Sequence, residues 1–401
     1  MTSYTHNAVD TVLLKLHKLG VPFLRLGNRR CVEAELRDHV IGEDDESIVS
    51  ATQFTERIRE HKVVGATCLG MRGALAESMT FDWCIVDEAS QITVPGVLGP
   101  LMHARKFVLI GDHNQLPPLV RSQDARKLGL EDSLFQILHT AHPQAVVELR
   151  VQYRMAFDIQ DVANTLVYSS KLVCGSKKAA ARTLFVLEPS DLGDLPAAQR
   201  AVLSRRCVAF VDTATFPTPQ RVAEERETDA IYNTFEANTV ADMVECLVMN
   251  GFQMDRVGVI TPYKRQIVAI NAAIEAKLQT LPSTVASVVV TKCKELLEVS
   301  TVDKYQGKDK ECIIVSLVRS NSDGVVGDLL NDYRRLNVAF TRAKSKLVVV
   351  GNSRTLSTNP FLSHFVRLCH TRHWTESMAH DPPLSPSPPP IPSTHRPSTH
   401  C

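Results

Sequence analysis

The sequence predicts an α/β protein with two parallel-sheet domains, and three observations lead to this fold class. Short apolar runs alternate with segments of helical periodicity along most of the chain. Several apolar runs end abruptly in polar residues, as parallel strands do when their carboxyl ends share one edge of a sheet. The 401 residues are enough for two or three domains. We expect a first domain over residues 1–150, a second over 151–374, and a disordered tail over 375–401.

The composition is that of an ordinary globular protein, with 44% hydrophobic and 22% charged residues. The formal net charge is +1, so no overall field marks a nucleic-acid partner and any DNA or RNA contact must be local. The ten cysteines are scattered without metal-ligand spacing, and we expect free thiols in a reducing compartment. No apolar run approaches the roughly 18 residues of a membrane span, and no signal peptide is recognisable. We therefore expect a soluble intracellular protein without membrane contact.

The first domain is expected to begin with a hydroxyl-rich segment, residues 1–10, that precedes an amphipathic helix. Apolar residues from Val9 to Leu19 recur at helical spacing. The hydroxyl-rich segment could contact phosphates or simply cap the helix, and these residues alone favour the cap. Residues 27–60 are polar, and we expect them to be helical and peripheral. Three strands ending in polar residues are expected over residues 63–68, 81–86 and 106–110.

Two adjacent carboxylates, Asp87 and Glu88, directly follow the second of these strands. In open α/β sheets, ligands bind beyond the carboxyl ends of the strands. An Asp in that position can hold Mg²⁺, while the next Glu can orient or deprotonate a water that attacks a phosphate. Alone, such a pair is about as often a solvated strand end. The prediction of a phosphoryl-transfer site therefore depends on the rest of the sequence.

A second set of alternating elements predicts the second domain. Residues 170–206 mix Gly, Lys, Ala, Pro and Ser without a period, and we expect a surface excursion there. From Thr375 the chain is rich in Pro, Ser, Thr and His and cannot bury enough apolar surface to order itself. The strands of this domain are expected over residues 207–211, 257–260, 312–318 and 347–350, and its helices over about 228–249 and from Lys264.

Five polar clusters on these two domains share one chemical explanation. A nucleotide bound between two domains would be served by metal and water from one side and by arginines from the other, which neutralise charge on the γ-phosphate. Arginine suits this task because its planar fork meets phosphate oxygens bidentately. The clusters are residues 87–88, 111–118, 152–154, 301–307 and 334–344.

Taken together, the five clusters resemble motifs II to VI of superfamily 1 helicases, in the subgroup that includes the nonsense-mediated-decay helicase. The segments Asp-Glu-Ala-Ser-Gln, Thr-Val-Asp-Lys-Tyr-Gln-Gly and Arg-Arg-Leu-Asn-Val-Ala are most similar to one eukaryotic family, the DNA helicase/nucleases that process Okazaki-fragment flaps and resect broken ends. The resemblance covers nearly everything from Thr2 to about Gly351. It implies two RecA-like domains, the first incomplete at its N-terminus, with ATP and Mg²⁺ as cofactors.

The resemblance implies catalytic roles for five residues. Asp87 would hold Mg²⁺, and Glu88 would activate water. Gln115 would sense the γ-phosphate and link hydrolysis to the DNA groove. Arg154 and Arg342 would act as arginine fingers, although either could instead form a surface ion pair, which contributes little.

Further residues would bind the nucleotide or the DNA backbone by the same resemblance. Tyr153 would stack near the adenine, unless its ring belongs to the core. Asp309, just after Gln306 and Gly307, takes the place of the acidic residue that meets the ribose, unless it is a solvated turn residue. The candidates for the DNA backbone are Thr5, His6, Thr67 and Thr301.

The sequence departs from the family at the phosphate-binding loop, because no G-x-x-x-x-G-K-[ST] occurs in it. The family's nuclease half, with its iron-sulfur cluster, has no counterpart here either. We therefore expect the C-terminal portion of a helicase/nuclease, with negligible ATP hydrolysis by this chain alone. The alternatives are a non-catalytic remnant that binds nucleic acid or a partner, and another superfamily 1 RNA or DNA helicase.

The resemblance also implies partners and a location. The partners would be single-stranded DNA, flap DNA, and replication or repair proteins such as the single-strand-binding protein. Movement along a strand by backbone contacts implies binding that is independent of sequence and strongly salt-dependent. The protein would act as a monomer in the nucleus, and the sequence leaves open whether mitochondria receive it too.

Overall fold

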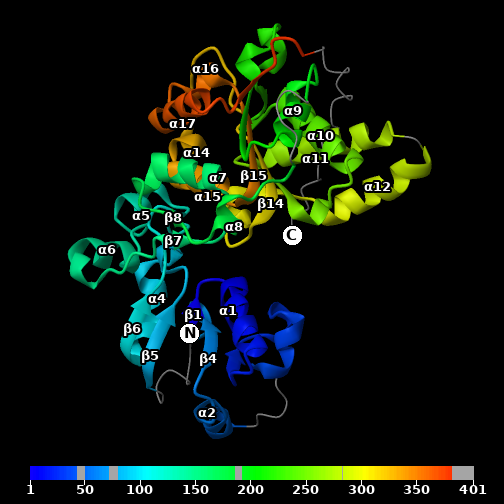
Figure 1. Cartoon of the computed structure of the whole chain (residues 1–401). Coiled ribbons are helices and arrows are strands. Elements are labelled where there is room, and N and C mark those ends of the chain that lie inside the picture. The colour runs from blue at the N-terminus through cyan, green and yellow to red at the C-terminus, as the bar shows by residue number, and fades with distance from the viewer. Residues whose placement is uncertain (43–49, 72–79, 186–191, 282, 382–401) are drawn as a thin grey trace, which may run out of the picture. The chain divides into compact units, whose positions relative to one another are not determined.

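The structure, a computed structural model, describes residues 1–42, 50–71, 80–185, 192–281 and 283–381. It divides into two compact units, Met1–Glu148 and Leu149–Cys401 (Figure 1). Each unit contains a six-stranded parallel sheet with helices packed on it, so the predicted α/β class with two parallel-sheet domains is confirmed. The units divide two residues before the boundary expected at residue 150.

The first unit is built on a sheet with the strand order β3-β2-β4-β1-β5-β6, in which every pair is parallel. Three of these strands lie where the sequence predicts them. The other three, β1, β2 and β3, were not predicted, and β3 lies in the segment expected to be helical. The strands are β1 (Thr2–Ser3), β2 (Leu24–Leu26), β3 (Val40–Ile41), β4 (Val64–Thr67), β5 (Phe81–Val86) and β6 (Ala104–Leu109). The helices are α1 (His6–Lys18), α2 (Ala51–Arg59), α4 (Val94–Met102), α5 (Gln123–Lys127) and α6 (Leu134–Ala141).

Alternation along the strands decides which side chains of the first sheet are buried. On β5, Cys84 and Val86 point to the face that packs against Val97 of α4. The opposite face of β4 lies under α1, where a Cβ atom at Gly65 would come within 2.7 Å of Leu13 Cδ1. Glycine at this position therefore lets α1 approach the sheet closely.

Part of the α1 side of this sheet is exposed among the described residues. Trp83 and Ile85 on β5 point to this face, and they are 53% and 40% exposed. Ile85 is in register with Val108 on β6, which is 41% exposed, and Ile110 follows at 45%. These four residues form what we call the exposed apolar patch. It lies beside β6, which is the edge strand of the sheet.

The second unit contains a larger set of elements around a sheet with the strand order β13-β12-β14-β15-β9-β16, again entirely parallel. Its strands are β9 (Val208–Asp212), β12 (Val257–Thr261), β13 (Glu298–Thr301), β14 (Lys310–Ser316), β15 (Ala343–Gly351) and β16 (Thr375–Ser377). Two small sheets pair β7 (Val151–Gln152) with β8 (Val173–Cys174), and β10 (Glu225–Glu227) with β11 (Ala230–Tyr232). The helices of at least seven residues are α7 (Phe157–Ala163), α9 (Ala197–Leu203), α10 (Thr234–Met249), α11 (Lys264–Gln279), α12 (Ser283–Leu296), α15 (Tyr333–Phe340) and α17 (Pro360–Thr371). The shorter ones are α8 (Lys177–Ala180), α13 (Val302–Tyr305), α14 (Asp328–Asn331) and α16 (Ser353–Leu356).

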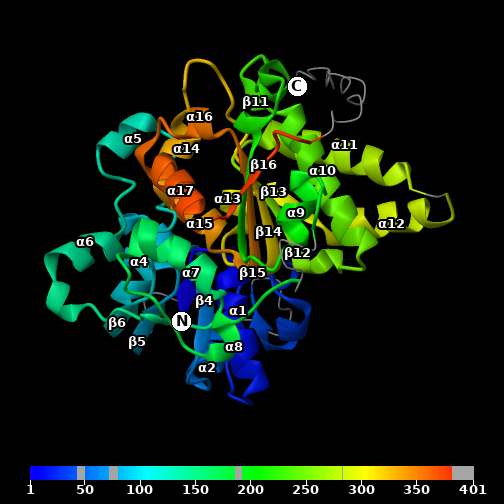
Figure 2. The same cartoon turned by 45° about the horizontal axis from the view of Figure 1, so that its top comes forward.

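Helices cover both faces of the second sheet. Figure 2 shows β14 and β15 between α10 and α11 on one side and α15 and α17 on the other. Ile314 and Val348 belong to the core under α9, α10 and α11. On the opposite face, Phe365 of α17 packs against Phe210 of β9 and Phe340 of α15, with ring centroids 5.8 and 4.8 Å apart. The strands of this sheet are therefore apolar on both faces, as expected for a buried parallel sheet.

Two expectations about the second unit are wrong in part. The segment 170–206 is not wholly a surface excursion, because α9 within it is buried at Ala197, Ala201 and Val202. The predicted disordered tail does not begin at residue 375, because β16 pairs in parallel with β9 and extends the sheet. The rest of that tail, 382–401, lies outside the described residues.

No described helix is long and apolar enough to cross a membrane. The described cysteines, which are all except Cys401, are free thiols.

Candidate functional site

Asp87 and Glu88 lie immediately beyond the carboxyl end of β5, where the sequence places them. The backbone N–H of Asp87 donates to Thr2 O at 2.9 Å, which ties the acids to the end of β1. Glu88 has a left-handed backbone, with φ 52° and ψ 38°, and its Oε2 accepts a hydrogen bond from Gln91 Nε2 at 2.6 Å. A residue other than glycine in this conformation is strained, and such strain concentrates at functional sites.

The loop after β6 lies beside this turn. A Cβ atom at Gly111 would lie 2.9 Å from the backbone nitrogen of Ser90, so glycine permits the close approach of the two segments. Within the loop, Asp112 Oδ2 accepts a hydrogen bond from Gln115 Nε2 at 3.1 Å, and its Oδ1 accepts from the backbone N–H of Asn114 at 2.9 Å. Asp112 therefore fixes Gln115, the residue expected to sense the γ-phosphate.

The same edge of the sheet holds two buried hydroxyl groups without a hydrogen-bond partner among the described residues, Ser3 Oγ and Ser90 Oγ. Buried polar groups normally have partners, so this edge has donors to spare for a polar ligand. No group of three or more His, Cys, Asp or Glu that could hold a metal occurs in the part of the chain described. Mg²⁺ that is bound with a nucleotide needs only one or two carboxylates plus phosphate oxygens. The residues present therefore fit a magnesium nucleotide.

The first-unit candidates for the DNA backbone have local roles in the fold. Thr5 Oγ1 accepts the backbone N–H of Ala8 at 3.3 Å, so Thr5 caps α1, as its sequence context favoured. Thr67 Oγ1 caps the following turn by accepting the backbone N–H of Gly70 at 3.1 Å. His6 is half-buried, and its Nδ1 lies 3.1 Å from a nitrogen of Arg25.

In the second unit, three of the predicted clusters meet at Asp309. Arg154 Nε lies 3.3 Å from Asp309 Oδ2, and Lys344 Nζ lies 2.5 Å from Asp309 Oδ1. Each side chain is between 31% and 40% exposed. Asp309 is therefore a shared anion for two cations, a role that neither interpretation of Asp309 included. For Arg154, the alternative expected from the sequence, an ion pair near the surface, is the one that the structure shows.

Gln152 organises the segment that carries Arg154. Its Oε1 accepts the backbone N–H groups of Arg154 and Met155, both at 2.8 Å, and its Nε2 donates to Gln160 Oε1 at 2.9 Å. Tyr153 is 63% exposed, so its interpretation as a core residue is wrong. A Cβ atom at Gly175 would lie 2.3 Å from Tyr153 Cε1, so the ring lies directly on this glycine.

Arg342 is only 3% exposed. Its Nε donates to Val338 O at 3.1 Å, so the surface ion pair considered for this residue is wrong. The turn between α13 and β14 holds Gly307, with φ +78°, and Gln306, whose Nε2 is buried without a hydrogen-bond partner among the described residues. Thr301 ends β13, in register with Thr261 at the end of β12.

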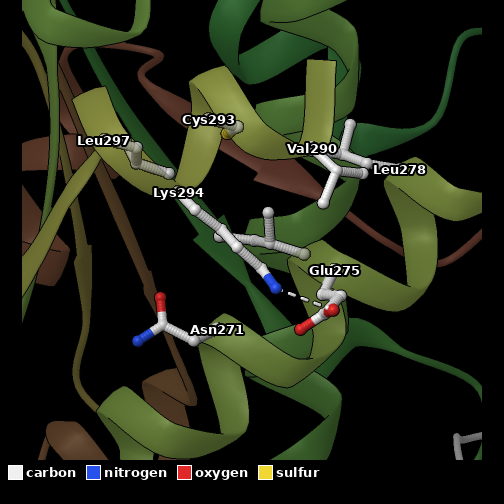
Figure 3. A pocket seen from close by; sticks show the side chains of 8 residues that line it. Asn271, Glu275, Leu278, Val290, Cys293, Lys294 and Leu297 are labelled. Carbon is white, nitrogen blue, oxygen red and sulfur yellow. Dashed lines mark hydrogen bonds and ion pairs between the residues drawn. The ribbon is translucent and has the colours of Figure 1, made fainter. Parts of the chain in front are cut away.

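A pocket between α11 and α12 contains none of the predicted site residues. Figure 3 shows Lys294 extending across it to Glu275, with a nitrogen-to-oxygen distance of 2.8 Å. Leu297, which also lines it, directly precedes the first residue of β13, whereas Thr301 ends that strand. The pocket is therefore separate from the carboxyl edge of the sheet.

Sequence reasoning missed a buried ion pair beside His6. Arg25 lies in the apolar strand β2, and its Nε is 2.8 Å from Asp10 Oδ1 with both side chains almost fully buried. A charged residue inside an apolar run requires a buried partner. Asp10 lies next to Val9 on the buried face of α1, so the signal was present in the sequence.

Two family matches cover most of the chain. Residues 130–354, more than half of the chain, match a protein family described as an AAA domain. Residues 39–123 match a second family with the same description.

The chain is also similar to curated proteins from several eukaryotes. It is 42% identical over 364 residues to DNA replication ATP-dependent helicase/nuclease JHS1 of Arabidopsis thaliana, covering 90% of this chain and 25% of that protein. It is 40% identical over 372 residues to DNA replication ATP-dependent helicase/nuclease DNA2 of Mus musculus, covering 90% of this chain and 33% of that protein. The relative of the same name from Saccharomyces cerevisiae is 36% identical over 391 residues, covering 95% and 24%. The chain thus spans about a quarter to a third of the length of these relatives.

Among solved structures, the chain aligns with the Arterivirus nonstructural protein 10 helicase at 13% identity and a TM-score of 0.38, covering 87% of this chain and 52% of that chain. From the extent of the first family match and the similarity to curated proteins, the chain belongs to the AAA domain family and is homologous to one part of the DNA replication ATP-dependent helicase/nucleases.

Proposed function

We propose that this chain is the C-terminal helicase portion of an ATP-dependent DNA helicase/nuclease that acts in DNA replication and double-strand-break repair. It couples ATP hydrolysis to movement along single-stranded DNA. The observation that carries the proposal is the 36–42% identity, over at least 90% of the chain, to proteins that bear this name. The two acids beyond the carboxyl end of β5 and the cluster of charged side chains around Asp309 in the second unit support it.

The first unit contributes the groups that act on metal and water. A bound magnesium nucleotide supplies the γ-phosphate and the metal ion. Asp87 holds the metal, and Glu88, fixed by Gln91 at 2.6 Å, orients the attacking water. Gln115 is held by Asp112 close to the turn that carries both acids, where it senses the γ-phosphate.

The second unit contributes the cations and the base-binding residues. Arg154 and Arg342 neutralise charge on the phosphate as it transfers. Tyr153 offers an exposed ring for stacking on the adenine. Asp309 meets the ribose beside Gln306 and Gly307, and its existing pairs with Arg154 and Lys344 are then exchanged for nucleotide contacts.

The phosphate-binding loop comes from polypeptide outside these 401 residues. The exposed apolar patch and the edge strand β6 support this part of the proposal, because a further strand and helix would pair with that edge and cover those side chains. This chain alone therefore hydrolyses ATP negligibly.

Single-stranded DNA and flap DNA are the proposed nucleic-acid ligands. Thr5, His6, Thr67 and Thr301 contact the backbone of the strand, and such contacts carry little sequence information. The protein works as a monomer in the nucleus, with replication and repair proteins such as the single-strand-binding protein as partners.

Fluorescence anisotropy with labelled oligo(dT) tests the proposal. The logarithm of the affinity should fall linearly with the logarithm of salt concentration, with a slope of about 0.7 for each phosphate contacted. A mixed-sequence oligonucleotide of the same length serves as the control and should bind equally well. Affinity that is insensitive to salt, or selective for one sequence, would contradict the proposal.

A further inference from the structure

The side chain of His6 is held by a hydrogen bond to a buried arginine. It is the first residue of α1, and its Nδ1 lies 3.1 Å from Arg25 Nη2. Arg25 is fully buried; its Nε donates to Asp10 Oδ1 at 2.8 Å, and its Nη1 donates to Leu26 O at 2.6 Å. Asp10 Oδ2 in turn accepts the backbone N–H of Glu33 at 3.1 Å. The guanidinium that faces His6 is therefore held in place through each of its three nitrogens.

This contact determines where the proton of the imidazole lies. A guanidinium has only donors, so the ring nitrogen that faces it must be an acceptor. Nδ1 of His6 is consequently unprotonated, and the ring hydrogen of the neutral side chain is on Nε2. Within the part of the chain that the structure describes, Arg25 makes the only side-chain hydrogen bond to this ring, so the Nε2–H group can donate to a ligand.

We propose that Asp10 and Arg25 are positioning residues that hold His6 as the neutral Nε2–H tautomer, so that it donates a hydrogen bond to a phosphate oxygen of the bound nucleic acid. This inference rests on the proposed nucleic-acid function. It adds the protonation state of the contact and the two buried residues that set it.

The electrostatic surroundings of His6 agree with a neutral ring. Burial lowers the pKa of His6, and the adjacent positive charge of Arg25 lowers it further, while Asp10 partly opposes both. Protonation would also place a second donor against Arg25. A neutral donor releases no counterion from a strand, because it carries no charge to replace one.

The experiment uses the whole chain and labelled oligo(dT) at several salt concentrations. His6→Ala should lower the affinity about 10-fold, as for a hydrogen bond to a charged group. Its salt slope should equal that of the unmodified chain, and the loss should be the same between pH 6.5 and 8. His17→Ala, at the exposed end of the same helix, is the matched control and should leave the affinity unchanged. A smaller salt slope for His6→Ala would mean a charged contact and would overturn the inference.

Long-range proton–nitrogen NMR spectra of histidine-labelled protein test the tautomer directly. The signals that vanish in His6→Ala identify the residue, and they should show a proton on Nε2 alone from pH 6.5 to 8. A proton on Nδ1, or on both nitrogens, would overturn the inference. This measurement needs no substitution of a fully buried residue, so it stands even if Arg25→Lys fails to fold.

Arg25→Lys tests the positioning role, because a single ammonium keeps a charge beside Asp10 but lacks the planar fork that reaches His6. Cooperative thermal unfolding of Arg25→Lys shows that the variant is folded. Its spectra should then show both tautomers, and its affinity for oligo(dT) should fall as in His6→Ala. The double variant His6→Ala/Arg25→Lys should lose no more affinity than either single variant. Unchanged binding by His6→Ala would overturn this inference alone. Absence of any binding by the unmodified chain would overturn the proposed function, and this inference with it.

Discussion

The two units share one architecture but differ in how completely helices cover their sheets. Both are built on six parallel strands among the described residues. In the second unit, helices cover both faces of the sheet, and Asp309, just before β14, pairs with two cations at the amino edge of the sheet. In the first unit, the exposed apolar patch leaves one face of β5 and β6 uncovered among the residues described. The difference indicates that the sheet of the first unit needs a further partner to cover it, whereas the described helices already cover the sheet of the second unit.

The largest predicted effect tests whether the two unlike units serve one reaction. In a longer form of this protein that hydrolyses ATP, Glu88→Gln in the first unit and Arg342→Ala in the second should each lower turnover about 10³-fold, since the arginine alone contributes in this range. Because both act on one step, the double variant should lose little more than either single variant. Steady-state turnover of ATP with single-stranded DNA measures this.

Arg342→Lys is the control for the second-unit variant, because Arg342 is buried and donates to Val338 O. The lysine keeps the charge but not the planar fork, and its turnover should also fall. Circular dichroism should show that each variant is folded. Turnover that survives in folded Arg342→Ala would remove this residue from the mechanism.

A matched pair of substitutions tests the difference in coverage. Ile314→Ala in the second sheet removes a fully buried side chain and should cost about 2–5 kcal/mol of unfolding free energy. Ile85→Ala in the exposed apolar patch should cost only about 0.5 kcal/mol or less. The only two tryptophans, Trp83 and Trp374, lie in different units, so their fluorescence in urea follows each unit separately. An equally large cost for Ile85→Ala would mean that something covers the patch in solution.

Local patterns were sufficient to predict every described strand of five or more residues and the acids after β5, because an apolar run that ends in charge is a short-range signal. Two features were missed because their signals are weak. β16 has the polar sequence Thr375-Glu376-Ser377, and only its pairing with β9 makes it a strand. The alanine-rich α9 has no strong helical stripe, and its burial depends on α10 above it.

The candidate site shows the same limit. Asp87 and Glu88 could be predicted because they are neighbours in sequence. The cluster of Arg154, Asp309 and Lys344 could not, because its members are far apart in the chain and meet only through the order of the strands. The pair of Asp10 and Arg25 could be predicted in part. Each is a charged residue inside an apolar pattern and so needs a buried partner, but the sequence does not show that the two are partners of each other.

A buried acid in the second unit should make the stability of the two units depend differently on pH. Glu236 is fully buried, and desolvation raises its pKa from 4.5 to about 7, although hydrogen bonds from Ser316 and the backbone of Val318 oppose the rise. The folded state therefore binds the proton more tightly than the unfolded state, so stability is highest below about pH 4.5 and is lost as the pH rises toward 7 and above. At 1.36 kcal/mol for each pH unit, the loss between pH 4.5 and 7.5 is at most about 3 kcal/mol.

Urea unfolding of the second unit, followed by Trp374 between pH 5 and 7.5, measures this loss. Glu236→Gln keeps the shape and an oxygen acceptor but cannot titrate, so its stability should be flat over the same range. The first unit, followed by Trp83, should not share the Glu236 dependence. A second unit whose stability rises with pH in this window would show that Glu236 is ionised in the folded protein.

The smallest predicted effect on stability concerns Asp309, the anion that Arg154 and Lys344 share in the second unit. Asp309→Asn should change the unfolding free energy by less than about 1 kcal/mol, because its ion pairs are partly exposed. It should nevertheless raise the affinity for inorganic pyrophosphate several-fold, since Arg154 and Lys344 lose their shared anion. Asp242→Asn, which breaks a similarly exposed pair with Lys277, is the control and should leave pyrophosphate binding unchanged. Calorimetric titration with pyrophosphate and with adenosine separates the two roles of Asp309. If Asp309→Asn binds adenosine less tightly and pyrophosphate equally well, Asp309 contacts the ribose alone. That result would refute its function as the counter-ion of the two cations.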